Sequence, residues 1–174
     1  MKKLILLGLA VIVMTACKQE QRYFSSSAEI DALKSAISAL ENQDWDAFKS
    51  FYTSDGEIYV NSKDSITVDQ RIMDLQEITS ALSKYGFDEK DQFVEMIIDD
   101  DNETWVNFWG QWSCTFKYNG KQLSIPVHIT AQFIDGKASE EHIYYDGTSL
   151  SAEFNAMAAA AKMNEESMEA DSEE

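Results

Sequence analysis

Apolar side chains in the first half of the chain recur every three or four residues, which is the period of an α-helix. Three helices are predicted from this pattern, over residues 28–41, 45–52 and 69–85. Ser27 and Asp44 can cap the first two helices, and Gly86 ends the third. A short strand is expected between the second and third helices, over residues 57–61.

From residue 93 the period changes to two, which is the period of a β-strand. Four long strands are predicted, over residues 93–98, 105–118, 123–134 and 137–146. The pairs Asn119-Gly120 and Asp135-Gly136 are typical of two-residue hairpin turns. Helices followed by a meander of antiparallel strands predict an α+β fold, with three N-terminal helices packed on a curved sheet.

The alternation also assigns the two faces of the predicted sheet. In strand 123–134 one face carries only apolar residues and is expected to be core, whereas His128 points to the opposite side. In strand 105–118 the indoles Trp105 and Trp109 share a face with polar side chains. That mixture suits a ligand pocket, a contact between two sheets or a plain outer surface, and the pattern does not choose among them.

Composition narrows the class of protein. The 174 residues are 44% hydrophobic and 26% charged, which fits one globular domain. A formal net charge of −17 makes nucleic acid a poor partner, because the chain would be repelled by phosphate backbones. Two cysteines exclude a disulfide framework.

Residues 1–16 have the pattern of a bacterial secretory signal peptide. Lys2 and Lys3 precede an apolar run of about half the length that a membrane-spanning helix needs. The stretch Met14-Thr15-Ala16-Cys17 resembles a lipobox, which implies that Cys17 becomes the acylated first residue of a lipoprotein. A buried core helix and a single membrane-spanning anchor are the alternatives.

The lipobox implies that the protein is extracytoplasmic and held to a bacterial membrane through Cys17. Lys18 follows in place of the aspartate that retains many lipoproteins at the inner membrane, which favours the outer membrane, facing the periplasm or the surface. Residues 17–27 are polar and predict a tether. At the other end, residues 149–163 predict an alanine-rich helical extension, and 164–174 an acidic, disordered tail.

Between these ends, residues 28–148 resemble the nuclear transport factor two-like superfamily, in its SnoaL-like branch. The stretch Ala39–Phe48 resembles the opening of that fold, a helix followed by a polar turn and a short helix. Phe51–Ile58 resembles the return into the first strand. Phe133–Lys137 and Ile143–Asp146 resemble the "DGK, strand, YYD" ending of the sheet.

The resemblance implies a cone-like sheet wrapped around a helix, with a pocket between the helices and the concave face. Members of this superfamily often form homodimers through the sheet. They include isomerases, cyclases and dehydratases, as well as domains that only bind small molecules or proteins, so fold does not settle function.

The candidate site residues follow from chemistry that such a pocket needs. Asp146 and His128 are the candidate catalytic acid/base groups, because burial can shift a carboxyl or imidazole pKa into a useful range. The candidate ligand-pocket residues are Trp45, Tyr52, Tyr59, Trp105, Trp109 and Tyr145. Two histidines on different strands do not form a metal-ligand set, so neither a metal nor another cofactor is expected.

No convincing acid/base pair accompanies the fold pattern. The sequence therefore favours a membrane-anchored lipoprotein that binds a small, partly apolar ligand or a partner protein without catalysis. The alternatives are an isomerase, cyclase or dehydratase of the SnoaL-like kind, and a structural lipoprotein that dimerises.

Overall fold

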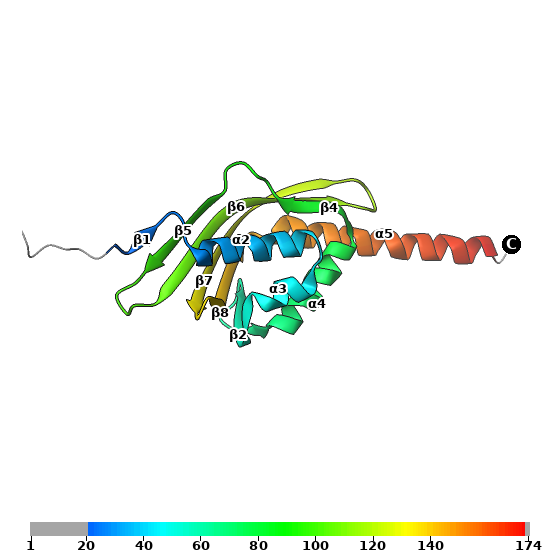
Figure 1. The fold of residues 1–174 in the computed structure, drawn as a ribbon. Coiled ribbons are helices and arrows are strands. Elements are labelled where there is room, and N and C mark those ends of the chain that lie inside the picture. Colours follow the sequence, from blue (N-terminus) through cyan, green and yellow to red (C-terminus); the bar gives the residue numbers. More distant parts are fainter. Residues whose placement is uncertain (1–20, 173–174) are drawn as a thin grey trace, which may run out of the picture.

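The computed structural model describes residues 21–172, which form one strongly curved sheet with helices packed against it (Figure 1). Within this range the elements are, in chain order, β1 (Tyr23–Phe24), α2 (Ala28–Glu41), α3 (Trp45–Ser50), β2 (Tyr52–Val60), β3 (Ile66–Thr67), α4 (Val68–Ser80), β4 (Leu82–Phe87), β5 (Phe93–Ile98), β6 (Thr104–Phe116), β7 (Gln122–Ile134), β8 (Lys137–Tyr145) and α5 (Thr148–Ser172). The mixed α+β class and the open curved sheet agree with the sequence prediction.

The sheet is organised around its two longest strands, β6 and β7. The strand order is β1-β5-β6-β7-β8-β2-β3. Strands β4 and β5 follow one another along the edge of β6 that β7 leaves free. All pairings are antiparallel except that of β2 with β8, which is parallel. The sheet of the described region thus has eight strands, more than the four long strands and one short strand expected.

The predicted helix over residues 69–85 is wrong at its C-terminal end. Helix α4 ends at Ser80, and the next residues form β4, with Leu82 opposite Phe116 of β6. Gly86 lies inside this strand with φ +154°, a conformation that favours glycine. The Glu41 carboxylate at the end of α2 accepts a hydrogen bond of 2.7 Å from the Phe87 N–H. Pairing with β6 therefore overrides the local helical pattern.

One of the two predicted hairpin turns has the expected form. Asp135 and Gly136 both have positive φ, as a two-residue turn between β7 and β8 requires. Between β6 and β7 the turn is longer, because Asn119 does not have positive φ and the Gly120 N–H donates to the Phe116 carbonyl. The prediction of a two-residue turn at Asn119-Gly120 is therefore wrong.

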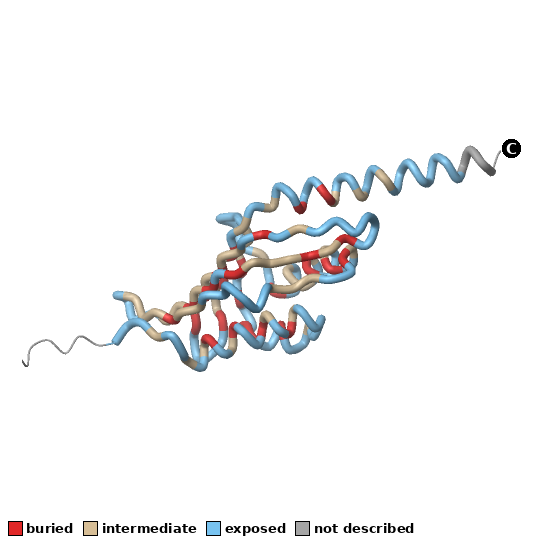
Figure 2. Tube along the Cα trace, turned by 90° about the horizontal axis from the view of Figure 1, so that it is seen from above, coloured by how far each residue is buried: buried red, intermediate tan, exposed pale blue. Residues whose placement is uncertain are grey.

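Both ends of the domain reach further than the sequence indicated. Strand β1 pairs with β5, so the last part of the predicted tether over 17–27 belongs to the sheet. Helix α5 runs to Ser172 across the predicted start of a disordered tail at residue 164. Beyond its first turns α5 projects from the domain and is mostly exposed (Figure 2). The predicted signal peptide over 1–16 and the lipidation site Cys17 lie outside the described residues. Among the described helices, none is both long enough and apolar enough to cross a membrane.

The apolar core consists of two clusters that share the concave side of the sheet. The larger cluster joins α2, α3 and α4 to the sheet and includes the fully buried Phe108 and Ile58. The smaller cluster lies between the β4–β6–β7 end of the sheet and the start of α5, where Leu150 packs near Phe116 and Ile125. Each buried Leu, Ile or Phe side chain of this kind contributes about 1.5–3 kcal/mol to folding.

A buried carboxylate fixes α5 to the β6–β7 hairpin. The Glu153 side chain is only 4% exposed and forms an ion pair with Lys121. It also accepts hydrogen bonds from the Tyr118 hydroxyl and, at 2.6 Å, from the Asn119 amide. The Lys121 ammonium, followed by the Tyr118 hydroxyl, lowers the pKa of Glu153 to about 2. Three donors on one carboxylate make this contact specific for the ionised form.

We predict that Glu153 stabilises the fold only while it is ionised. Its native pKa of about 2 lies below the ordinary value of 4.5, so its contribution is complete above pH 4.5 and is lost as the pH falls toward 2. Glu153→Gln should lower the melting temperature at pH 7, and the difference from the wild type should shrink toward pH 2. Glu165→Gln, on the exposed part of α5, is the matched control and should melt like the wild type. An equal deficit at pH 7 and pH 2 would contradict the prediction.

Candidate functional site

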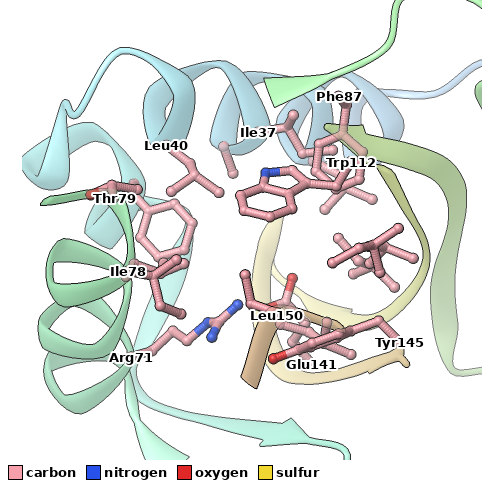
Figure 3. Close-up of a pocket in the computed structure, with 18 residues that line it drawn as sticks. Ile37, Leu40, Arg71, Ile78, Thr79, Phe87, Trp112, Glu141, Tyr145 and Leu150 are labelled. Carbon is pink, nitrogen blue, oxygen red and sulfur yellow. The ribbon is translucent and has the colours of Figure 1, made fainter. Parts of the chain in front are cut away.

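An apolar pocket lies between the helices and the concave face of the sheet (Figure 3). Its accessible volume is about 90 Å³, which is several times the space that one buried water needs. It is smaller than the 300–1,000 Å³ typical of pockets for drug-sized ligands. The wall is formed by side chains of α2, α3, α4, β4, β6, β7, β8 and the start of α5: Leu33, Ala36, Ile37, Leu40, Phe48, Arg71, Leu75, Ile78, Thr79, Phe87, Trp112, Ile125, Val127, Ile129, Glu141, Ile143, Tyr145 and Leu150.

The pocket forms where the two core clusters meet. Ile129, Leu33 and Phe48 of its wall belong to the larger cluster, whereas Ile125 and Leu150 belong to the smaller one. Strand β8 ends at Tyr145 opposite Val127, while β6 and β7 continue beyond it. The start of α5 covers the sheet beyond the end of β8, where Leu150 closes one end of the pocket wall.

One carboxylate is buried in this apolar wall. Glu141 projects from β8 and is only 4% exposed, and its Oε2 accepts a hydrogen bond of 2.6 Å from the hydroxyl of buried Tyr52 on β2. Burial raises the pKa of the Glu141 carboxyl above its usual value, against the opposing effects of the Tyr52 hydrogen bond and the Arg71 charge. Burial, and then the Glu141 charge, also raise the pKa of Tyr52 well above its usual value. Both groups are therefore harder to ionise in this site than in water.

A guanidinium group faces this carboxyl across the pocket. Arg71 extends from α4 into the space between Ile78 and Glu141 (Figure 3). Its Nε is buried and has no hydrogen-bond partner among the described residues. No ion pair within 4.0 Å joins Arg71 to Glu141 or to any other described carboxylate. The hydroxyl of Tyr145 points toward the same region from the sheet side (Figure 3).

The structure brings together only part of the predicted ligand-pocket set. Tyr145 lines the pocket, and Tyr52 reaches it through its hydrogen bond to Glu141. Trp45 packs at the border of the larger core cluster and is not part of the pocket wall. Tyr59, Trp105 and Trp109 lie on the outer face of the sheet and not in this pocket, and Trp109 lines a separate, open hollow there.

The two predicted catalytic residues both lie outside the pocket. His128 is on the outer face, where its ring stacks on Trp109 with centroids 4.5 Å apart and its Nδ1 lies 3.2 Å from the Phe108 carbonyl. Asp146 is exposed, and its Oδ1 accepts a hydrogen bond of 2.9 Å from the Thr148 N–H at the start of α5. Hydrogen bonds from Thr148 lower the pKa of Asp146. This geometry gives Asp146 a capping role in α5 and gives neither residue access to a molecule in the pocket.

Stacked aromatic rings form a row across the outer face of the sheet. Each ring stacks on or tilts against the next, with centroid distances between 4.5 and 6.3 Å, in the order Phe93, Trp109, His128, Tyr144, His142 and Tyr59. Trp109 is 38% exposed, and Phe93 and Tyr144 are more exposed still. We call these six residues the outer aromatic row. Within it, His142 Nε2 also lies 2.5 Å from the Glu140 carboxylate.

Sequence reasoning missed the polar groups of the pocket, although the sequence carries a signal for each. Glu141 shares the apolar face of its strand with Ile143 and Tyr145, so a carboxylate at that position is anomalous. Arg71 lies four residues before Leu75 of the buried stripe of α4, and it therefore shares the inward side of that helix. Neither pattern showed that the two side chains line the same pocket, because they come from elements that are about 70 residues apart in the chain.

Comparisons with known proteins identify the fold and not a function. No family model matches the chain, and no curated protein matches it. Among solved structures, AclR of Streptomyces galilaeus, described as a candidate hydroxylase, is similar with a TM-score of 0.59 and 12% identity, over 74% of this chain and 96% of that one. IdmH of Streptomyces antibioticus, described as a candidate polyketide cyclase, has a TM-score of 0.58 and 12% identity, over 73% and 98%.

A third similar structure is a SnoaL-like protein of Shewanella denitrificans, described as a candidate polyketide cyclase. Its TM-score is 0.57 at 18% identity, over 75% of this chain and 99% of that one. A protein from Burkholderia pseudomallei, similar to a comparable degree, is described as NTF2-like. The resemblance read from the sequence is thus supported at the level of the fold, which is that of the nuclear transport factor two-like and SnoaL-like proteins.

We predict that the charge on Glu141 lowers stability at neutral pH. Because burial raises its native pKa above the ordinary 4.5, the free energy of unfolding should fall as the pH rises from 4.5 through the native value. Glu141→Gln keeps an acceptor for Tyr52 and removes the ionisation, so it should raise the free energy of unfolding at pH 8 by about 1 kcal/mol. Urea unfolding at pH 8 and pH 4.5 measures the effect, with exposed Glu77→Gln on α4 as the control. A less stable Glu141→Gln protein at pH 8 would show that the native site holds a stabilised carboxylate.

Proposed function

We propose that this protein is a membrane-anchored extracytoplasmic lipoprotein whose domain binds a small, partly apolar molecule without transforming it. The observation that carries the proposal is the pocket between α2, α4 and the sheet, with its apolar wall and few polar groups. Pockets of this composition bind apolar bodies by excluding water and orient them through a small number of hydrogen bonds. The placement of Asp146 and His128 outside the pocket supports binding over the chemistry first expected of them.

The anchor part of the proposal rests on the lipobox-like stretch ending at Cys17. Strand β1 begins at Tyr23, so five residues separate the proposed lipid from the sheet. At about 3.3–3.6 Å per residue, this linker spans at most about 18 Å. The domain would thus lie close to the membrane surface.

Native mass spectrometry of the lipoprotein, extracted from bacterial membranes in mild detergent, tests both the anchor and the ligand-binding pocket. Loss of residues 1–16 together with acyl mass on Cys17 would support the anchor, and an additional small-molecule mass would support the pocket. Denaturing the protein should release the small molecule and leave the acyl mass. A chain that keeps residues 1–16 contradicts the anchor, and a protein that is ligand-free after gentle extraction and takes up no apolar probe contradicts the binding function.

A SnoaL-like enzyme is the second candidate, and Glu141 is the observation that favours it. A buried carboxyl with a raised pKa beside a phenol can exchange a proton with a bound molecule. This reading replaces Asp146 and His128 as the proposed base and keeps Tyr52 and Tyr145 as donors. If the retained molecule changes mass or exchanges a carbon-bound proton in D2O during incubation, and Glu141→Gln abolishes that change, the enzyme reading replaces the binding reading.

We also propose that two copies of the chain pair through the outer aromatic row. Exposed Phe93, Trp109 and Tyr144 lie there beside polar neighbours, and aromatic residues are enriched in interfaces between proteins. Sedimentation velocity at micromolar concentration should give a dimer, which Trp109→Glu should convert to monomer. Trp112→Phe, on the opposite face of the same strand, is the control and should stay dimeric. A wild-type monomer would contradict this arrangement.

A further inference from the structure

We infer that the pocket is selective for a compact monocarboxylate, whose acid group binds Arg71 while its apolar body fills the space beneath Trp112. This inference rests on the proposed binding function and adds the chemical class of the ligand. Four features of the pocket support it: the unpaired guanidinium, the hydrogen bond that already engages Glu141, the apolar wall and the volume.

The guanidinium is a cation that the described protein groups leave unsatisfied. It has five N–H donors, and none of the described hydrogen bonds uses Arg71 as a donor. Its Nε is buried without a partner, and no described carboxylate comes within 4.0 Å of it. Arg71 is partly buried, and burying its Nε without a partner is costly, so an anion that enters the pocket would supply a counter-charge that no described carboxylate brings within 4.0 Å.

The geometry of the guanidinium selects the class of anion. Its planar fork matches the two oxygens of a carboxylate, with which it can form two parallel hydrogen bonds. Figure 3 shows the group directed into the pocket, toward the region reached by Glu141 and the Tyr145 hydroxyl. A ligand carboxylate at that point would contact all three groups.

Glu141 does not serve as the counter-charge of the Arg71 guanidinium. Its Oε2 is already engaged by Tyr52, and it forms no ion pair within 4.0 Å with the Arg71 guanidinium. The same arrangement disfavours an amine, because a ligand cation would be placed beside the Arg71 guanidinium.

The rest of the pocket wall and the pocket volume limit the polarity and the size of the ligand body. Away from Arg71, Glu141 and Tyr145, the wall is apolar or aromatic except for Thr79. An accessible volume of about 90 Å³ accommodates a chain or ring of only a few carbon atoms. A short alkyl or small aryl group on one carboxylate satisfies both limits.

The test uses three six-carbon probes that differ only in the head group: hexanoate, hexan-1-ol and hexylamine. Binding to the purified lipoprotein at pH 7 is measured by isothermal titration calorimetry, and the four-carbon set of the same head groups controls for length. We expect hexanoate, or butanoate if the volume limits the chain, to bind about tenfold or more tighter than the matching alcohol, the usual scale of a charge-assisted pair. The amine should bind more weakly than the alcohol.

Three variants assign the preference to Arg71. Arg71→Gln should abolish the preference for the carboxylate over the alcohol, whereas Arg71→Lys should keep part of that preference. Arg22→Gln changes the other arginine, an exposed residue that pairs with Asp100, and should change nothing. If the Arg71 variants fail to fold, the affinities of the wild-type protein for the acid, the alcohol and the amine still test the inference.

The outcomes separate this inference from the function on which it rests. Equal affinity for acid and alcohol overturns the inference and leaves the binding function in place. Tightest binding of the amine overturns it too and makes Glu141 the polar anchor. If no member of either set binds, both the inference and the binding function are contradicted.

Discussion

The long antiparallel pairing of β6 with β7 organises the sheet and decides which side chains face the core. Twelve consecutive residue pairs, from Thr104–Phe133 to Thr115–Gln122, are in register. Since neighbouring side chains of a strand point to opposite faces, this register places Phe108 and Ile129 in the core and Trp109 and His128 outside. A slip of one residue would exchange the two faces and destroy the pocket and the outer aromatic row together.

The pocket places polar groups where the core would be more stable without them. Glu141 and Tyr52 satisfy one another in part, whereas the buried Nε of Arg71 has no partner among the described residues. Buried ionisable groups of this kind lower stability, and natural proteins retain them mainly where binding or chemistry needs them. The cost of these buried groups supports the proposal that the pocket binds a ligand and is not only a defect in the packing of the core.

The proposed ligand site, the outer aromatic row and the two ends of the domain lie in different parts of the fold. The inner face holds the proposed ligand, and the outer face carries the aromatic row. Strand β1 and the free end of α5 lie at opposite ends of the domain (Figure 1). An anchor before β1 would therefore leave α5 pointing away from the membrane, while Glu153 keeps the first turns of that helix fixed to the β6–β7 hairpin.

Periodicity predicted the α+β class and the apolar face of strand 123–134, and the backbone preferences of single residues predicted the turn at Asp135-Gly136. Neither was enough to predict that Leu82 begins a strand, that β2 pairs in parallel with β8, or that Arg71 and Glu141 line one pocket. Each of these depends on partners far apart in the chain. Local patterns report which side of an element is apolar, and they do not report what another element places against it.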